Sequence, residues 1–212
     1  MAKLGPEAGH IFRITHVRNL PWILEHGLHC ANSSTVDPNF VPIGLPDLIR
    51  KRAAWPVPVP PHGFLSDYVP FYFTPWSIMM CNITTGFNGV IKRPNREIAI
   101  IVSRVFRLAD YGVPFVFTNG HARLKETEFF SNTSDLGRID WKLLINKDFQ
   151  KDPEDPGKLG RYQAECLAFR HVPAQALLGI VCYDQQNATQ VAGEVERRGL
   201  DLSVKVIKDW YF

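Results

Sequence analysis

The chain has 212 residues, of which 45% are hydrophobic and 21% are charged, so its composition is that of an ordinary globular protein with one substantial core. Its formal net charge is only +3. This charge excludes the strong positive field that drives indiscriminate nucleic-acid binding, and any such contact must come from local clusters.

The first predicted element is a strand over residues 11–15, where apolar and polar residues alternate. A short helix follows, with Asn19 as its N-cap, Pro21 in its first turn and Gly27 at its end. His16 therefore lies at a strand-to-helix junction. There it is either a loop histidine bonded to a nearby carbonyl or a functional group.

Residues 31–62 are rich in prolines and turn formers, and we expect one or two helical turns around residues 45–54. A segment this long with so little regular structure is typical of a binding loop. The prolines of residues 56–61 exclude helix and stiffen one side of it. Three adjacent cations lie in the segment, either as a solvated face or as a ligand contact: Arg50, Lys51 and Arg52.

The middle of the chain predicts three strands and one helix, which are residues 69–73, 97–102 and 113–118, and residues 77–84. Tyr72 alternates with two phenylalanines, so it faces away from them and can present its ring to a ligand. The third strand ends in a turn that places His121 at the end of a strand.

The last third of the chain predicts a partly helical segment over residues 136–145 and an exposed, charged loop over residues 147–161. A strand follows at Glu165. Two further strands, over residues 177–183 and 202–207, bracket one helix that ends at Gly199. The apolar face of that helix is predicted to comprise Ala188, Val191, Ala192 and Val195.

Glu165 is a single carboxylate at the start of an otherwise apolar run. Burying a carboxylate costs free energy unless it has partners, so Glu165 is either one half of a structural ion pair or a functional group. From this stretch alone both interpretations stay open.

The cysteines and apolar runs indicate the compartment. The four cysteines never reach a Cys-x-x-Cys spacing, which is typical of free thiols in a reducing environment. His26, His29 and Cys30 lie close together, but no second cluster supplies the remaining ligands of a zinc site. No run approaches the roughly 20 apolar residues of a membrane span. We therefore expect a cytoplasmic protein that binds neither a metal nor a membrane.

Five motifs follow one another along the chain: Ile14-Thr15-His16, Val69-Pro70-Phe71-Tyr72-Phe73, Phe117-Thr118-Asn119-Gly120-His121-Ala122, Gln163-Ala164-Glu165 and Trp210-Tyr211-Phe212. In this order they resemble the DarT family of bacterial DNA ADP-ribosyltransferase toxins, over nearly the whole chain. The resemblance implies an α+β fold similar to the ADP-ribosyltransferases of poly(ADP-ribose) polymerase and diphtheria-toxin type. In that fold, a split, mostly antiparallel sheet with flanking helices binds NAD in its cleft. Residues 1–212 would form a single domain.

The implied reaction transfers ADP-ribose from NAD, the co-substrate, to a base of single-stranded DNA and releases nicotinamide without a metal. The resemblance does not say whether the base is thymine or guanine. It also implies a macrodomain antitoxin of the DarG type as a partner. Nothing in the sequence suggests an obligate interface, so we expect a bacterial, cytoplasmic monomer.

The resemblance also implies roles for individual residues. Glu165 resembles the catalytic glutamate, whose charge stabilises the ribose as its bond to nicotinamide breaks. An arginine of the 50–52 cluster, preferably Arg52, resembles the arginine that orients NAD near that bond. Within the loop region 31–62 and around it, the residues expected to hold NAD are Thr15, His16, Gly27, Arg52 and Tyr72. The acceptor would meet His121 and the substrate-recognition loop 147–161, through Lys151, Lys158, Arg161 and the following Tyr162.

Two residues depart from the family pattern. Trp76 stands where relatives often carry an arginine, which puts a phosphate contact at that position in doubt, and Cys166 stands where they often carry an aromatic residue. Three alternatives remain: an NAD glycohydrolase, a transferase acting on RNA or protein, and a binding module without catalysis. The intact Glu165 argues against the binding module.

Overall fold

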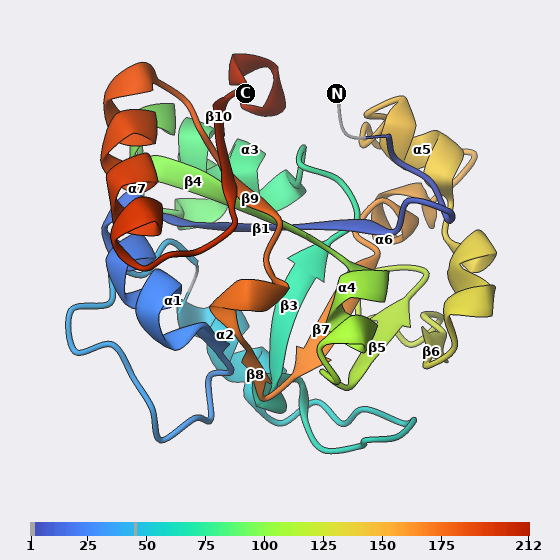
Figure 1. Ribbon diagram of the computed structural model, residues 1–212. Helices are drawn as coiled ribbons and strands as arrows, with labels where there is room; N and C mark the ends of the chain where they lie inside the picture. Colours follow the sequence, from blue (N-terminus) through green and yellow to red (C-terminus); the bar gives the residue numbers. More distant parts are fainter. Residues whose placement is uncertain (1–2, 45) are drawn as a thin grey trace.

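The computed structural model describes residues 3–44 and 46–212, so Leu45 in the predicted helical segment lies outside the described residues. These residues form an α+β structure around one eight-stranded sheet (Figure 1). The strand order is β10-β9-β4-β1-β3-β7-β5-β6. All neighbours in this sheet are antiparallel except β9 and β10.

The strands agree with most of the predicted ones. They are β1 (His10–His16), β3 (Tyr68–Tyr72), β4 (Ile98–Arg104), β5 (Phe115–Thr118), β6 (Phe129–Phe130), β7 (Glu165–Phe169), β9 (Gly179–Cys182) and β10 (Ser203–Val206). A second, two-stranded sheet pairs β2 (Leu28–His29) with β8 (His171–Val172). The sequence analysis does not anticipate the two-residue strands, because they are too short to show an alternating pattern.

The helices are α1 (Leu20–His26), α2 (Pro46–Ala53), α3 (Ile78–Thr85), α4 (Val105–Asp110), α5 (Trp141–Ile145), α6 (Lys158–Arg161) and α7 (Gln185–Arg197). Helix α4 was not predicted, because the apolar run of β4 passes into it without a turn signal. In α7 the prediction that Ala192 belongs to the buried face is wrong. Ala192 is exposed, whereas Ala188, Val191 and Val195 are buried.

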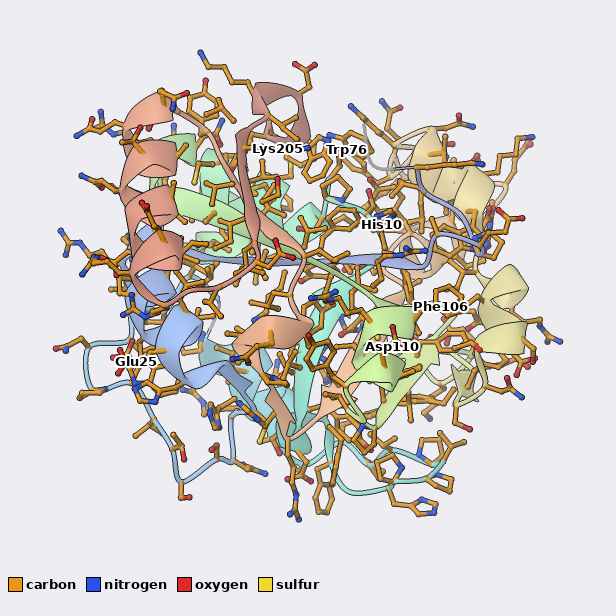
Figure 2. All side chains as sticks on the ribbon, in the orientation of Figure 1. His10, Glu25, Trp76, Phe106, Asp110 and Lys205 are labelled. Atoms are coloured by element: carbon orange, nitrogen blue, oxygen red, sulfur yellow. The ribbon has the colours of Figure 1, made fainter. Side chains whose placement is uncertain are left out.

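The core lies on both faces of the sheet. Helices α1, α4, α5 and α7 contribute buried side chains to the cluster that contains Ile11 and Phe71, while α3 and the C-terminal turn pack on Phe12 and Ile14. Figure 2 shows side chains filling the space between the sheet and its helices. Among the described residues, no helix is both long and apolar enough to cross a bilayer.

The sheet is split at its centre. Strand β1 pairs with β4 along its whole length, from His10↔Arg104 to His16↔Ile98, but it meets β3 at one pair, Phe12↔Tyr72. In Figure 1, β3 rises towards β1 and runs across its direction. Strand β3 in turn pairs with all of β7, and this ladder ends at Tyr72↔Glu165. The split between β1 and β3 therefore opens next to Tyr72 and Glu165.

Candidate active site

Glu165 is the first residue of β7 and only 2% of its surface is exposed. Its backbone N–H donates to Thr118 Oγ1 at 3.1 Å, and the Thr118 hydroxyl donates to the Gly120 carbonyl at 2.6 Å. The end of β5 and the turn after it are thereby tied to the start of β7. These bonds fix the backbone from which the carboxylate projects.

The carboxylate itself has partners from two distant segments. Arg52, at the end of α2, donates from Nη1 to Oε1 at 3.1 Å and from Nη2 to Oε2 at 2.7 Å. The backbone N–H of Ala122 donates to Oε1 at 3.1 Å. A carboxylate has about four acceptor positions, so one position on Oε2 remains for a ligand.

Arg50 and Arg52 have different surroundings. Arg50 lies on the outside of α2 and pairs with Asp47, where both side chains are largely exposed. Arg52 is turned inward, and its side chain is only 16% exposed. The structure therefore selects Arg52 as the arginine of the 50–52 cluster that reaches the carboxylate.

The charges of the pair reinforce one another. Burial by itself would raise the pKa of Glu165, but the Arg52 guanidinium outweighs it and holds that pKa below its usual value. Burial likewise acts to lower the pKa of Arg52, and the Glu165 charge outweighs it, so both groups are ionised at neutral pH. Burial and the Glu165 charge raise the pKa of Tyr72 to about 12, which keeps its phenol protonated.

His121 lies in the turn that supplies Ala122. Its backbone N–H donates to the Gly160 carbonyl at 2.9 Å, and its ring Nδ1 accepts from the backbone N–H of Arg123 at 3.2 Å. Burial lowers the pKa of His121 despite the attraction of Glu165. A neutral imidazole therefore stands beside the carboxylate.

His16 lines a cavity of about 670 Å³ together with Arg18, Arg93, Glu97 and Asn187. Its Nδ1 accepts from the Arg18 N–H at 3.1 Å and its Nε2 lies 3.5 Å from Glu97 Oε2. Burial and Arg93 lower its pKa. The structure thus separates His16 from the Glu165 cluster and gives it a pocket of its own.

Thr15 and Gly27 have structural contacts. The Thr15 hydroxyl accepts from Asn19 Nδ2 at 3.1 Å, which secures the start of α1. Gly27 ends α1 with φ 79°, and a Cβ there would lie 2.4 Å from the Val172 carbonyl oxygen. These contacts explain both residue types without a ligand, so the expected contact with NAD stays a prediction for each.

Three of the four residues predicted to meet the acceptor are engaged by partners within the chain, so their contact with the acceptor stays a prediction. Lys158 Nζ lies 2.8 Å from Asp148, and Arg161 forms two bonds to Asp155, at 3.0 and 2.6 Å. The acidic residues of the same loop thus already neutralise both cations. Tyr162 is 1% exposed and its hydroxyl donates to the Trp76 carbonyl at 2.8 Å, so in this structure its ring lies in the core. Lys151 is exposed and stays a candidate.

Trp76, the departure from the family pattern, is a packing residue. It lies beside the C-terminal turn (Figure 2), where its Nε1 donates to the Asp209 carbonyl at 2.7 Å. Cys166 is fully buried in the core, and burial raises the pKa of its thiol. Neither departure alters the contacts of Glu165.

Arg13 was missed by the sequence analysis. Its Nη1 donates to the Pro70 carbonyl at 2.8 Å, across the split where the ladder between β1 and β3 has stopped. Burial lowers its pKa to about 10, with Tyr72 opposing this shift and Arg52 adding to it. Among the described residues, its Nε has no hydrogen-bond partner and its charge has no carboxylate in salt-bridge contact. Among the described residues, two arginines, Arg13 and Arg52, thus lie near the split with one carboxylate, Glu165.

The family model described as "ssDNA thymidine ADP-ribosyltransferase, DarT" matches residues 12–212 of the chain. The chain belongs to the DarT family. The DNA ADP-ribosyl transferase of Escherichia coli O127:H6 (strain E2348/69 / EPEC) is 47% identical to it over 211 residues, which are 100% of this chain and 97% of that protein. This membership confirms the recognition drawn from the five motifs.

Solved DarT structures share the fold. Thermus sp. 2.9 DarT in complex with ADP-ribosylated ssDNA is 31% identical, with a TM-score of 0.89 and full coverage of both chains. The same protein in complex with NAD⁺ gives a TM-score of 0.83 at 30% identity, over 96% of this chain and 98% of that one. Thermosipho africanus DarTG in complex with ADP-ribose gives 0.71 at 20% identity, over 96% of this chain and 51% of that one.

The expected α+β ADP-ribosyltransferase fold is confirmed by these DarT structures. The chain is a NAD-dependent DNA ADP-ribosyltransferase, and NAD is its co-substrate. Within the described residues, no three or more His, Cys, Asp or Glu side chains form a group that would hold a metal ion.

Burial of histidines predicts sensitivity to acid. Burial lowers the pKa of His16, His29 and His121 below the ordinary histidine value of about 6.5. Below about pH 6.5 the unfolded chain then binds more protons than the folded one, so stability falls as the pH falls through the folded pKa values. We expect the Tm to drop between about pH 7.5 and about pH 5, and His29→Asn to reduce that slope. The exposed His62 provides a control, His62→Asn; an equal effect there would contradict the assignment.

Proposed function

We propose that the chain transfers ADP-ribose from NAD to thymidine in single-stranded DNA, with Glu165 at the reacting centre. The observation that carries this proposal is the buried Arg52–Glu165 pair, completed by the Ala122 N–H, at the end of the split in the sheet. The family description, which specifies thymidine, supports the choice of base.

Breaking the bond between nicotinamide and ribose leaves positive charge on the ribose. An ionised carboxylate held in place by three donors stabilises that charge without having to reorganise. The unused acceptor position is on Oε2, so we assign to this oxygen the bond to a ribose hydroxyl. The departing nicotinamide takes the bonding electrons and the DNA base supplies the new bond. The base proton then leaves to Glu165 or to the neutral His121.

Two regions of the structure can bind the two ends of NAD. Arg52 and the neutral Tyr72 border the reacting end, where Tyr72 offers a ring for the nicotinamide. The cavity beside His16, with Arg18 and Arg93 in its wall, offers cations and space for the other end of the dinucleotide. Thr15 and Gly27 join these residues as NAD contacts in this proposal, and the 31–62 segment contributes Arg52 at the end of α2.

One assay tests the acceptor. The purified chain is incubated with labelled NAD and, in turn, thymidine-containing single-stranded DNA, a thymidine-free strand, duplex DNA, RNA and protein. We expect label only on the thymidine-containing single strand. Free ADP-ribose with every acceptor would instead identify a glycohydrolase. Label on RNA or protein would identify a different transferase, and NAD binding without turnover would identify a binding module.

We propose a macrodomain antitoxin of the DarG type as the partner, acting in the bacterial cytoplasm on a monomeric toxin. The likeness to Thermosipho africanus DarTG, of which this chain covers 51%, supports a second module in such systems. Co-expression with a macrodomain protein is expected to restore growth and remove label from DNA. If the label on DNA and the toxicity both persist during co-expression, this partner is contradicted. The monomer is tested separately by size-exclusion chromatography, where a dimer would contradict it.

Arg13 provides a prediction about substrate binding. Arg13→Met removes the surplus cation at similar volume and breaks one bond, to Pro70. We expect the free protein to keep its stability within about 1 kcal/mol, because a buried charge without a partner also costs free energy. The affinity for ADP-ribose, whose diphosphate is anionic, should fall at least about tenfold.

Calorimetry with ADP-ribose and chemical denaturation measure the two effects. Arg107→Met is the matched control, because Arg107 also donates to a backbone carbonyl, that of Gln175. If the Arg13→Met variant is destabilised but keeps its affinity for ADP-ribose, Arg13 has only a structural role, which is to link β1 to β3.

A further inference from the structure

A site for single-stranded DNA needs cations that are not already paired with acidic side chains, and aromatic rings that are accessible to bases. Lys158 and Arg161 are paired with acids, and Tyr162 is buried. Arg123, by contrast, directly follows Ala122, whose N–H donates to Glu165 at 3.1 Å. Among the described residues Arg123 makes no ion pair, and its buried Nε has no hydrogen-bond partner. The Arg123 guanidinium can therefore bind a ligand, and it belongs to the residue next to Ala122, whose N–H donates to the Glu165 carboxylate.

Trp55 lies under this guanidinium. The Arg123 Cζ is 5.6 Å from the centroid of the Trp55 ring. Trp55 in turn follows α2, and its N–H donates to the Arg52 carbonyl at 3.1 Å. Each of the two segments that hold the Glu165 carboxylate therefore also contributes one member of the Trp55–Arg123 pair.

An exposed aromatic side chain lies on the segment that pairs with Trp55, on the other face of that pair, because Phe64 stands opposite Pro56. The Leu65 N–H donates to the Trp55 carbonyl at 2.9 Å, and Phe64 bridges to Pro56, so the two chain segments run side by side. Phe64 is 48% exposed, so its ring is accessible to a ligand. Aromatic rings that stack bases, next to a cation that meets phosphates, are the chemistry that binds single-stranded nucleic acid.

We infer that Trp55 and Arg123 form the acceptor surface of this enzyme, with Phe64 on the other face of the same pair of segments, and that these residues bind the nucleotides that flank the modified base. The guanidinium lies on the tryptophan face, and its outer N–H groups donate to a DNA phosphate. Phe64 stacks on a neighbouring base. This surface rests on the proposed function, and it replaces most of the 147–161 loop as the part that selects single-stranded DNA.

The test is steady-state kinetics with a thymidine-containing oligonucleotide and NAD, each varied in turn. For Arg123→Met and for Phe64→Ser we expect the KM for the oligonucleotide to rise about tenfold, and the KM for NAD to change less than about twofold. Arg123→Met should also reduce the slope of log KM for DNA against log salt by about 0.7, the loss of one phosphate contact on a single strand. Arg123→Lys should keep most of that slope, since it keeps the charge.

Two controls match these variants in chemistry. The Arg107 Cζ lies 5.2 Å from the ring centroid of the exposed Tyr111, the C-cap of α4, so Arg107→Met removes an equivalent arginine–aromatic pair, and Phe87→Ser removes another exposed phenylalanine. Neither should change the KM for DNA. Because Phe64 is exposed, Phe64→Ser retains a folded protein even if Arg123→Met does not, and fluorescence anisotropy of a labelled oligonucleotide measures its binding directly.

The outcomes separate this inference from the proposed function. If the parent chain labels no single-stranded DNA, the proposed function fails. If the parent labels DNA but Arg123→Met and Phe64→Ser keep their KM for DNA and their salt slope, the inference is overturned. A fall in kcat with an unchanged KM for DNA would also overturn it, because the pair would then act only by holding the two segments around Glu165.

Discussion

Glu165→Gln is expected to reduce the transfer of ADP-ribose to DNA at least about a thousandfold, because it removes the charge that stabilises the ribose cation. The amide oxygen can still accept from the Ala122 N–H, so the loss of charge, more than a loss of shape, is tested. Single-turnover labelling of a thymidine-containing oligonucleotide with labelled NAD measures the rate. Expression of the variant should also be far less toxic than that of the parent.

The matched control for this variant is Glu128→Gln. Glu128 also pairs with an arginine, Arg138 at 3.2 Å, but both side chains are more than half exposed. Its removal should leave the transfer rate unchanged. A rate for Glu165→Gln within about tenfold of the parent would show that another group carries the charge in the transition state.

Arg52→Met is expected to act on both stability and the pH dependence of the reaction. The Arg52 guanidinium holds the pKa of Glu165 below its usual value against the effect of burial. Without it, burial raises that pKa, so the acidic limb of the pH–rate profile should move to higher pH. Because the carboxylate is left buried with one backbone donor, we expect a loss of about 3 kcal/mol of stability.

Arg52→Lys separates charge from geometry. A lysine keeps the positive charge but offers no fork for two parallel bonds, so the transfer rate should fall while the pH profile shifts less than in Arg52→Met. Arg50→Met is the control, since Arg50 pairs with Asp47 at the surface of the same helix. An unchanged pH profile in Arg52→Met would contradict the coupling between Arg52 and Glu165.

The order of the strands along the chain could be predicted because each strand carries a local pattern. The alternation in β1, the apolar run of β4 and the aromatic residues of β3 all follow from which face of a strand is buried. The same patterns placed Glu165 at the start of β7 and His121 in a turn at the end of a strand. Five motifs in order then identified the family.

The contacts between distant segments had no local signal. Acidic residues of their own loop neutralise Lys158 and Arg161, whereas Arg123 makes no ion pair among the described residues. The sequence alone does not show this difference. Tyr162 follows a charged loop, yet the short helix α6 turns its ring into the core. Arg13 occupies an ordinary polar position in an alternating strand, and its role depends on the point where β1 and β3 part.

The sequence by itself determined the longer strands, their order along the chain and the carboxylate at the head of β7, because burial and turn chemistry act over a few residues. Only the tertiary structure decided that Glu165 is ion-paired, and its role in the reaction is our proposal. Its partner, Arg52, lies 113 positions away in the chain, and such a contact depends on the register of β3 with β7 and on the split beside them. The two interpretations of Glu165 are therefore compatible, since the same pair that offsets the cost of burial also keeps the carboxylate charged for the reaction.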